Sequence, residues 1–313
     1  MGFWQGKTIV VTGGSGFIGS HVVEKLQRSH SVHPTDLRVP RSGKHDLRVF
    51  RNCVEVLQGA DIVIHLASSV GSVEFNQRHP ASQYYDCNLI NLQVLEAARQ
   101  VGVEKFVGVS CACAYPKDVT YPLQEDMIHE GLPEPSHLGY GLAKRQMIVQ
   151  ASTYREQYDM DAVTVIPVNS YGPRDNYDLI RGHVIPALIR KCFEENELVV
   201  WGDGSAQRDF LYVEDLSEGI VTAAEHLHDS RPINLAAGTA VSISGIVENI
   251  VKLTGFQGSV SFDKSMPNGQ PLRVADISRA EALIGFKPRY SLEEGLKKTI
   301  NWYQNSKLSA RSA

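Results

Sequence analysis

A glycine-rich stretch close to the start of the chain constrains the fold more than any other feature. Residues 7–11 form an apolar run typical of a buried strand, regularly spaced glycines follow it, and a helix is expected over residues 17–29. Glycines at this spacing let the backbone turn tightly and approach a pyrophosphate, and the start of the helix offers free amide donors. This strand–loop–helix context predicts a dinucleotide-binding site made of Gly13, Ser15, Gly16, Phe17, Ile18 and Gly19.

Strand and helix patterns alternate through the first half of the chain. We expect further strands over residues 31–35, 61–66, 105–110 and 162–167, and helices over residues 88–101 and 140–158. This βαβα alternation predicts an α/β fold, a Rossmann-type doubly wound parallel sheet with helices on both faces.

The second half is interrupted by prolines and by a turn at residues 201–204. Short strands are expected over residues 198–201, 210–213 and 233–235, and a last helix over residues 292–303. This pattern predicts a smaller α/β substrate-binding lobe. We therefore assign residues 1–168 plus about 211–236 to a dinucleotide-binding domain, and residues 169–210 plus 237–313 to the lobe.

The choice of dinucleotide depends on Asp36, which is expected to follow the second strand. A carboxylate there accepts hydrogen bonds from the adenosine ribose hydroxyls and repels a 2′-phosphate, so NAD(H) is preferred over NADP(H). The neighbouring Arg38 and Arg41 could still accommodate the phosphate of NADP(H). Other residues expected beside the cofactor are Asp46, Leu47, Leu66, Ala67 and Ser68.

Charge and cysteine content exclude several classes of function. The net charge of −4 offers no basic surplus for a nucleic acid. No apolar run approaches the roughly 20 residues that span a bilayer, and the N-terminus lacks a signal-peptide pattern. The chain has five irregularly spaced cysteines, which favour reduced thiols in the cytoplasm over a disulfide framework or a zinc site, so no metal is expected.

A tyrosine and a lysine four residues apart form the predicted catalytic pair. Tyr140 and Lys144 lie on one face of a predicted helix. A nearby ammonium lowers the pKa of a phenol, so Tyr140 could exchange a proton with a substrate hydroxyl.

These motifs together resemble the extended short-chain dehydrogenase/reductases, which include sugar-nucleotide epimerases and dehydratases. The segments around Cys113, Tyr140, Asn169, His183 and Arg208 are similar to the GDP-L-fucose synthase family, and the first is also similar to GDP-mannose 3,5-epimerase. The resemblance extends over essentially the whole chain. It implies isomerisation of a 4-keto sugar at carbons 3 and 5, reduction of carbon 4, and a nucleotide-diphosphate sugar as substrate.

The resemblance also implies roles for individual residues. Cys113 and His183 would transfer protons on opposite faces of the sugar, while Tyr140, Lys144 and Cys111 would serve the redox step. The family implies further cofactor contacts from Pro167, Asn169 and His183. The residues expected to bind the substrate are Asn169, Val184, Arg190, Trp201, Arg208 and Arg273.

The sequence departs from the family at two positions. Cys111 stands where the family has a catalytic serine or threonine, and a thiol is a weaker hydrogen-bond donor. Asp36 is a carboxylate that the fucose synthases, which favour NADPH, lack.

Three hypotheses follow. The first is a GDP-L-fucose-synthase-like 3,5-epimerase and 4-reductase, favoured by His183. The second is an epimerase with tightly held NAD and no net redox change, favoured by Asp36. The third is a non-catalytic dinucleotide-binding sensor, which the Tyr140–Lys144 pair argues against. A homodimer is expected through the helices over residues 88–101 and 140–158, with Leu89, Leu92, Ile148 and Tyr154 at the interface.

Overall fold

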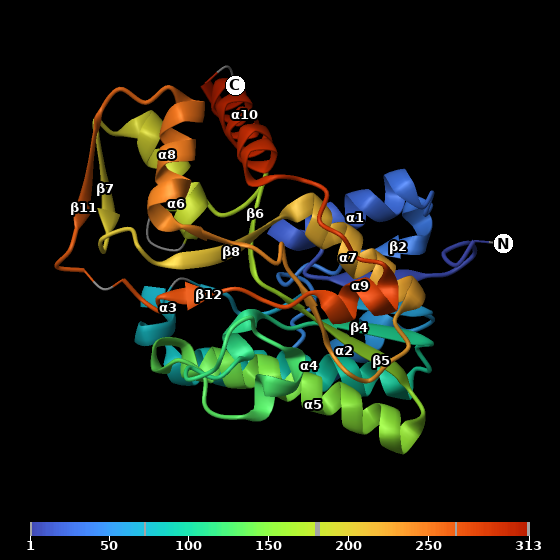
Figure 1. Ribbon diagram of the computed structural model, residues 1–313. Coiled ribbons are helices and arrows are strands. Elements are labelled where there is room, and N and C mark those ends of the chain that lie inside the picture. Colours follow the sequence, from blue (N-terminus) through green and yellow to red (C-terminus); the bar gives the residue numbers. More distant parts are fainter. Residues whose placement is uncertain (1, 72, 179–181, 267, 312–313) are drawn as a thin grey trace.

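The alternating apolar runs of the first half pair into one parallel sheet. The computed structural model describes residues 2–71, 73–178, 182–266 and 268–311, and these form a six-stranded sheet in the order β2-β1-β3-β4-β5-β9 (Figure 1). Its strands are β1 (Ile9–Thr12), β2 (Leu37–Arg38), β3 (Ile62–His65), β4 (Lys105–Val109), β5 (Asp161–Pro167) and β9 (Ile233–Leu235). Every pairing between them is parallel, which confirms the predicted doubly wound α/β fold.

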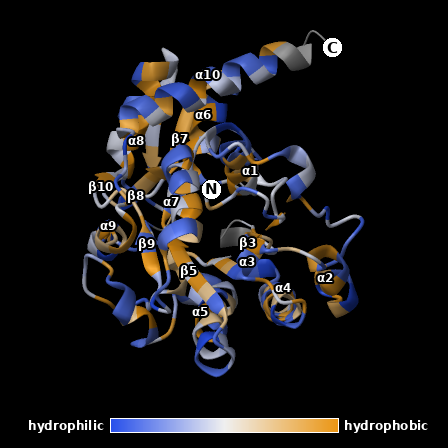
Figure 2. Ribbon diagram, turned by 90° about the vertical axis from the view of Figure 1, so that its right-hand side faces the viewer, coloured by the Kyte–Doolittle hydropathy of each residue, from blue (hydrophilic) through white to orange (hydrophobic). Residues whose placement is uncertain are grey.

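Helices cover both faces of this sheet, because its strands are apolar on both sides. Ile9 and Val11 join one buried cluster with α1 (Phe17–Ser29) and α7 (Val213–His226). Val10, between them, points to the other face and joins the cluster that includes α2 (Phe50–Leu57) and α4 (Pro80–Gln100). The long helix α5 (Leu138–Tyr158) packs beside α4. Figure 2 shows hydrophobic residues along strands of this sheet such as β5 and β9.

The second lobe contains two smaller sheets around a separate core. Strand β8 (Gln207–Tyr212) pairs with β6 (Asn169–Tyr171), β10 (Ala240–Ser242) and β12 (Leu272–Arg273). Strand β7 (Glu197–Trp201) pairs with β11 (Ser259–Asp263). The helices of this part are α6 (Val184–Glu194), α8 (Ile243–Thr254) and α10 (Leu292–Arg311). Their apolar faces meet around Tyr171, Leu188 and Ile250.

Most predicted elements lie close to their expected bounds. Helix α1 and strand β9 have the bounds that were expected, whereas α4 begins eight residues before the predicted helix and α10 continues eight residues beyond it. The sequence analysis did not predict the helices α2, α3 (Val73–Arg78), α6, α7, α8 and α9 (Ser278–Ile284), nor the strands β6, β10, β11 and β12. Four short 3-10 segments were also missed, namely η1 (Pro34–Asp36), η2 (Ala112–Ala114), η3 (Glu125–His129) and η4 (Pro135–His137).

The predicted second strand, over residues 31–35, is wrong. Pro34 begins η1, and the strand is only the two residues Leu37 and Arg38, which follow it. Leu37 lies opposite Ile9 and Arg38 opposite Val10 in the register with β1. Asp36 therefore lies before the second strand and not after it.

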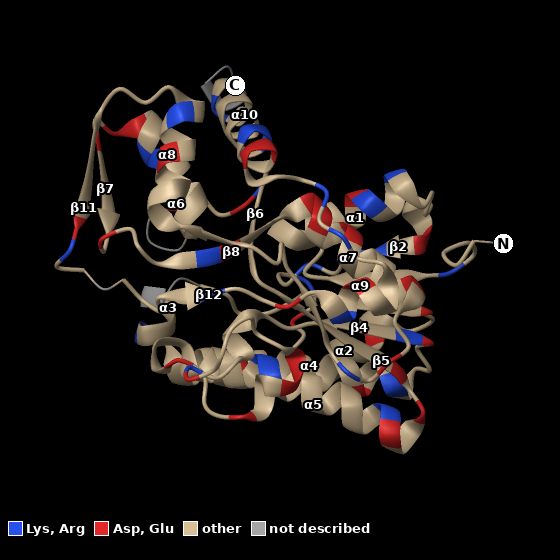
Figure 3. Cartoon of the chain, viewed as in Figure 1, with Lys and Arg blue, Asp and Glu red and all other residues tan. Residues whose placement is uncertain are grey.

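The surface carries both signs of charge. Figure 3 shows acidic and basic residues interspersed along the outer helices, for example on α5 and α10. Within the described ranges, no helix combines the length and the apolar character needed to cross a bilayer. The same residues contain no group of three or more His, Cys, Asp or Glu side chains that could hold a metal ion.

Candidate active site

The glycine loop between β1 and α1 has the geometry that close approach to a phosphate requires. Gly13 has a φ of +70°, and a Cβ on it would lie 2.8 Å from the backbone nitrogen of Ala67. No side chain caps the start of α1 at Gly16, so its first amides remain available to an anion. The loop thus lies against the end of β3, where Leu66, Ala67 and Ser68 follow. This tight cradle fits the pyrophosphate of a dinucleotide, because a side chain would fill it.

A buried polar network, which the sequence analysis missed, fixes this end of the sheet. Burial lowers the pKa of His65 to about 3, so the imidazole is neutral. His65 Nδ1 lies 2.7 Å from Thr12 Oγ1, which also accepts from the Ala67 amide, and His65 Nε2 lies 3.2 Å from Asn91 Oδ1. Asn91 in turn donates to the Ala143 carbonyl at 3.0 Å. The network therefore ties the glycine-loop strand to α4 and α5.

The structure removes the basis for a ribose contact by Asp36. In a parallel sheet the cofactor lies beyond the carboxyl ends of the strands. Asp36 lies at the amino end of β2, and its Oδ1 accepts from the Thr35 hydroxyl. The residue after β2, Val39, is the one beside the loop, since a Cβ on Gly14 would lie 2.9 Å from Val39 Cγ1. The expectation of a 2′-phosphate-repelling carboxylate at this strand end is wrong.

The other residues expected near the adenosine have local partners. Arg38 donates from Nη1 to the Gln58 carbonyl at 2.7 Å. Asp46 accepts from the side chain of Arg48, which lowers the pKa of the carboxyl, and Arg48 also pairs with Asp86 at 3.0 Å. Leu47 packs against the buried cluster that includes Cys53 and Leu57 of α2.

Tyr140 and Lys144 lie one turn apart on α5, as their spacing predicts. The Lys144 ammonium lies 5.8 Å from the centre of the Tyr140 ring and donates to the Val109 carbonyl at 3.0 Å. Burial, together with the neighbouring thiols of Cys111 and Cys113, raises the pKa of Tyr140 well above its usual value. The net direction is opposite to the lowering that was expected from Lys144, because burial is the largest cause of the shift. A phenol that stays protonated is suited to donate a proton.

Two thiols meet in front of this pair. Ser110 turns away, since its buried hydroxyl donates to the Lys144 carbonyl at 3.0 Å, so Cys111 is the residue that interacts with Tyr140. The Cys113 pKa is held well below its usual value, first by a hydrogen bond from Cys111 and then by His137 and the charge of Arg273. Burial and the same Cys113 contact raise the pKa of Cys111 well above its usual value. Cys113 is thus the better proton acceptor of the two.

His183 reaches the same site from the second lobe. It is the N-cap residue of α6, and its Nδ1 lies 3.4 Å from Oδ1 of the buried Asp175. Asp175, followed by the Cys113 charge, raises the pKa of His183. The structure therefore brings Cys113 and His183 together, as expected. The sequence analysis missed Asp175 as a site residue, although an acid eight residues before a candidate histidine was a usable signal.

Two arginines form a basic pair beside the thiols. Arg208 and Arg273 lie opposite each other on the paired strands β8 and β12. Burial and the charge of Arg273 lower the pKa of Arg208, and Arg273 donates to the Ala112 carbonyl at 3.0 Å. Two adjacent guanidinium groups repel each other unless an anion lies between them, so this pair suits a diphosphate.

The other residues that were expected to bind the substrate differ in whether their side chains are exposed or already hydrogen-bonded. Trp201, at the end of β7, is 62% exposed, and Val184 is 37% exposed. Asn169 donates to the Asp209 carbonyl at 2.9 Å. Arg190 is already held by Glu194 at 2.7 Å and by the Tyr177 carbonyl at 3.0 Å, so the structure does not direct it to the site. Pro167 ends β5, next to the strand end that bears Cys111.

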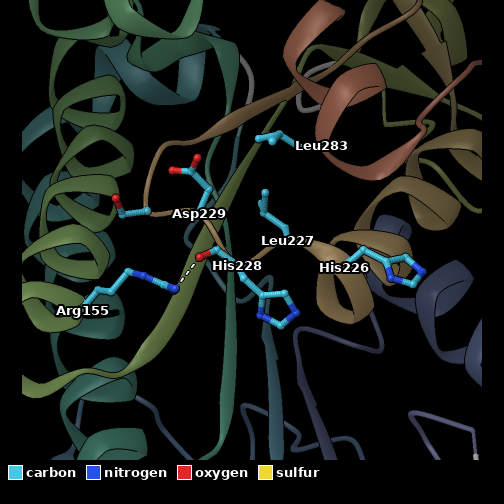
Figure 4. Close-up of a pocket in the computed structure, with 7 residues that line it drawn as sticks. Arg155, His226, Leu227, His228, Asp229 and Leu283 are labelled. Atoms are coloured by element: carbon cyan, nitrogen blue, oxygen red, sulfur yellow. Dashed lines mark hydrogen bonds between the residues drawn. The ribbon is translucent and has the colours of Figure 1, made fainter.

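A surface pocket elsewhere in the molecule does not contain this chemistry. Figure 4 shows it lined by Arg155, His226, His228 and Asp229, among others. These residues lie near the carboxyl ends of α5 and α7, at the amino edge of the sheet and thus opposite the glycine loop. The Arg155 guanidinium donates to the His228 carbonyl there.

Comparison with known proteins agrees with the geometry. Residues 9–236 match the model of the NAD dependent epimerase/dehydratase family. The chain is 33% identical to a probable GDP-L-fucose synthase 1 of Oryza sativa subsp. japonica, over 98% of this chain and 95% of the relative. It is 31% identical to the GDP-L-fucose synthase of Escherichia coli (strain K12), over 94% and 96%. A crystal structure of a GDP-L-fucose synthetase from Naegleria fowleri bound to NADP superposes with a TM-score of 0.89 at 27% identity, covering 99% of this chain and 98% of the other.

Proposed function

Because the chain belongs to the NAD dependent epimerase/dehydratase family, we propose that it is a GDP-L-fucose-synthase-like 3,5-epimerase and 4-reductase. Its substrate would be a GDP-linked 4-keto-6-deoxymannose. The observation that supports this most directly is that Cys113 and His183, from different parts of the fold, share one site with Tyr140 and Lys144. A simple reductase has no need for the first two.

The epimerisation step uses a negatively charged thiolate and a positively charged imidazolium as its two proton-transfer groups. A ketone at carbon 4 acidifies the protons on carbons 3 and 5. Cys113, with its lowered pKa, accepts such a proton, and His183, with its raised pKa, returns one from the other face and inverts the centre. Asp175 keeps the imidazole oriented and favours its charged form.

The reduction half uses the pair on α5. A bound nicotinamide dinucleotide would supply the hydride, held by the glycine loop and by residues 66–68. Tyr140 donates its proton to the carbon-4 oxygen as negative charge develops there, and Lys144 keeps the hydroxyl in a positively charged environment. Cys111 lies beside Tyr140 as a second, weaker donor.

The second lobe anchors the nucleotide. Arg208 and Arg273 are placed to bind the diphosphate, and the exposed ring of Trp201 offers a stacking surface for the base. Asn169 and Val184 lie at the lobe boundary, where the sugar would enter. We accordingly keep the division into a dinucleotide-binding domain of residues 1–168 plus about 211–236 and a substrate lobe of the remainder. A cytoplasmic location would keep the five cysteines, all free here, reduced.

Product analysis tests this function. The protein is incubated with GDP-4-keto-6-deoxymannose and NADPH or NADH in deuterated water, and the product is identified by NMR. GDP-L-fucose carrying deuterium at carbons 3 and 5 is expected. Deuterium exchange without reduction would instead support an epimerase with no net redox change, and no turnover would support a sensor. Asp36 does not lie at the carboxyl end of β2, so it no longer favours an epimerase with no net redox change over the 3,5-epimerase and 4-reductase.

For the cofactor we propose NADP(H), in place of the NAD(H) preference that Asp36 suggested. Arg38 is the last residue of β2. Val39 follows it beside the glycine loop, and Arg41 comes two residues later. Arg41 is an exposed basic group just beyond this strand end, and the Arg38 guanidinium would leave the Gln58 carbonyl to join it at the phosphate. The Naegleria fowleri protein, bound to NADP, has the same overall fold.

Replacing both arginines tests the cofactor proposal. Arg38→Ala combined with Arg41→Ala is expected to weaken NADPH binding by about tenfold or more while NADH binding stays nearly constant, because only NADPH has the 2′-phosphate that a guanidinium would hold. Calorimetry with both dinucleotides measures the ratio. Asp36→Asn is the matched control and should leave that ratio unchanged. A tighter fit for NADH in the wild-type protein would overturn the proposal.

We also propose a homodimer through α4 and α5. Apolar side chains remain exposed on this adjacent helix pair, including Tyr85, Leu92 and Val149. Ile148, which was expected at the interface, is buried in the core, and the Tyr154 hydroxyl donates to Glu96 at 2.9 Å. A second copy packed on this face would form a four-helix interface.

Light scattering at micromolar concentration tests the dimer. The wild-type mass should be twice that of the chain, and Leu92→Glu combined with Val149→Glu should give a monomer, since charges would be buried in an apolar contact. Val260→Glu, at an exposed position on β11, is the control and should remain dimeric. A monomeric wild-type protein would contradict the proposal.

A further inference from the structure

His137 lies next to the site, where it helps to lower the pKa of Cys113, but the reaction described above gives it no proton to carry. It ends η4 and directly precedes α5, three residues before Tyr140. Its Nδ1 lies 3.2 Å from Ser136 Oγ. Its Nε2 is buried and makes no hydrogen bond of normal distance and angle in the described ranges, although the imidazole does interact with the Cys113 thiol. A buried polar atom without a partner costs free energy, so such an atom in a site suggests a partner gained during the reaction.

The imidazole lies close enough to the Cys113 thiol to interact with it, and the packing of α5 places the two segments together. Gly141 lies four residues after His137, and residues so spaced share a face of the helix start. A Cβ on Gly141 would lie only 2.3 Å from the backbone oxygen of Cys113. The turn that contains Cys113 is therefore pressed against the face of α5 that begins at His137.

The Cys113 thiol has charged and titratable neighbours from every element around it. Those that interact with it electrostatically are Cys111 from its own turn, His137, Tyr140 and Lys144 from the η4–α5 segment, His183 from α6 and Arg273 from β12. Arg273 is already committed to the Ala112 carbonyl at 3.0 Å, and His183 to Asp175 at 3.4 Å. His137 is the member of this set that has a buried ring nitrogen with no hydrogen bond to any other group in the described ranges.

We propose that His137 is a positioning residue for Cys113, in a role that rests on the function proposed above. Its Nε2 accepts the proton of the Cys113 thiol, so the S–H bond breaks and an N–H bond forms. The resulting imidazolium then hydrogen-bonds the thiolate and holds it toward the sugar. The thiolate takes the proton from carbon 3 or 5, forming a new S–H bond and an enolate. His183 protonates the enolate from the opposite face.

The state of the thiol can be measured without any substrate. Iodoacetamide reacts with a thiolate, so the alkylation rate of Cys113 against pH reports its ionisation. Cys111 and Cys113 lie in the same tryptic peptide, and fragmentation mass spectrometry separates their modification. The variants are His137→Asn and His137→Gln, which keep a polar side chain of similar size. His129→Asn is the matched control, because His129 is an exposed histidine in the preceding segment η3.

In both His137 variants the midpoint of the Cys113 alkylation curve should move to higher pH. The sign follows from charge: an imidazolium stabilises the thiolate, so its loss raises the pKa of the thiol. At pH 6.5 the alkylation rate should fall about tenfold for each unit of displacement, and the curves should converge at alkaline pH. The control should follow the wild-type curve. Unchanged midpoints in both His137 variants, with dinucleotide binding intact, would overturn the proposal.

Turnover measurements separate this inference from the proposed function. With GDP-4-keto-6-deoxymannose, both variants should lose deuterium incorporation at neutral pH, recover part of it at pH 9, and keep the wild-type KM. If the wild-type protein does not turn over this substrate, the proposed function fails, and the alkylation curves still decide whether His137 ionises Cys113. A loss of activity that is equal at every pH would show a purely structural role and would also overturn the proposal.

Discussion

Replacing Cys113 with serine is expected to slow deuterium incorporation at carbons 3 and 5 by about 10²–10⁴-fold, the usual contribution of a general base. The thiol has a lowered pKa because Cys111, His137 and Arg273 all favour its charged form. A serine hydroxyl in the same surroundings stays protonated at neutral pH and cannot accept the proton. NMR of the recovered substrate in deuterated water measures the rate.

Two control measurements accompany this prediction. Dinucleotide binding by Cys113→Ser should equal that of the wild-type protein, because the glycine loop lies between β1 and α1 and does not include Cys113. Cys192→Ser is the control, since Cys192 lies on α6 outside the site and should keep full exchange. Wild-type exchange in Cys113→Ser would mean that Cys113 is structural, and the 3,5-epimerase function would be excluded.

Tyr140→Phe should have the second large effect, a loss of about 10²–10⁴-fold in hydride transfer. The phenol is the group next to Lys144, and burial raises its pKa, so it holds a proton throughout the neutral range. Phenylalanine fills the same space but has no proton to give. Single-turnover oxidation of NADPH, followed by absorbance, measures the step.

The same variant separates the two half-reactions. Deuterium exchange at carbons 3 and 5 should survive in Tyr140→Phe, since Cys113 and His183 remain. Its pH profile for exchange should also keep the wild-type shape: the lowered pKa of Cys113 maintains the base form to lower pH, and the raised pKa of His183 maintains the acid form to higher pH. Equal loss of both steps would mean that Tyr140 organises the site as a whole.

The elements that the sequence predicted well are those with strong local patterns. Helix α1 was predicted from end to end, because Val22 and Leu26 repeat on one face and the glycine loop sets its start. Central strands such as β3 and β4 are mostly apolar, since every position in them is buried. The edge strand β2 was misplaced because it has only two residues and pairs on one side, so no apolar run marks it. The misplacement of Asp36 followed from that error, and it removed the argument for NAD(H) from a carboxylate at the ribose.

Among the catalytic residues, too, the sequence predicted only what depends on local spacing. The spacing of Tyr140 and Lys144 on one helix was a local signal, and the structure keeps them one turn apart. Local spacing could not reveal that Ser110 donates to the Lys144 carbonyl and leaves Cys111 facing Tyr140, because the two side chains of adjacent strand-end residues point to opposite sides. Ile148 was assigned to a surface for the same reason, and the structure buries it.

What the sequence by itself determined was the parallel α/β architecture, the glycine loop and the Tyr140–Lys144 pair, because each depends on residues within one strand, one turn or one helix. Only the tertiary structure decided which side chains share a site. Cys113, Asp175, His183 and Arg273 come from separate segments of the chain, and His137 became relevant only through the packing of α5 against the Cys113 turn. The ionisation of these groups depends on burial and on charges distant in sequence, and those are set when the chain folds.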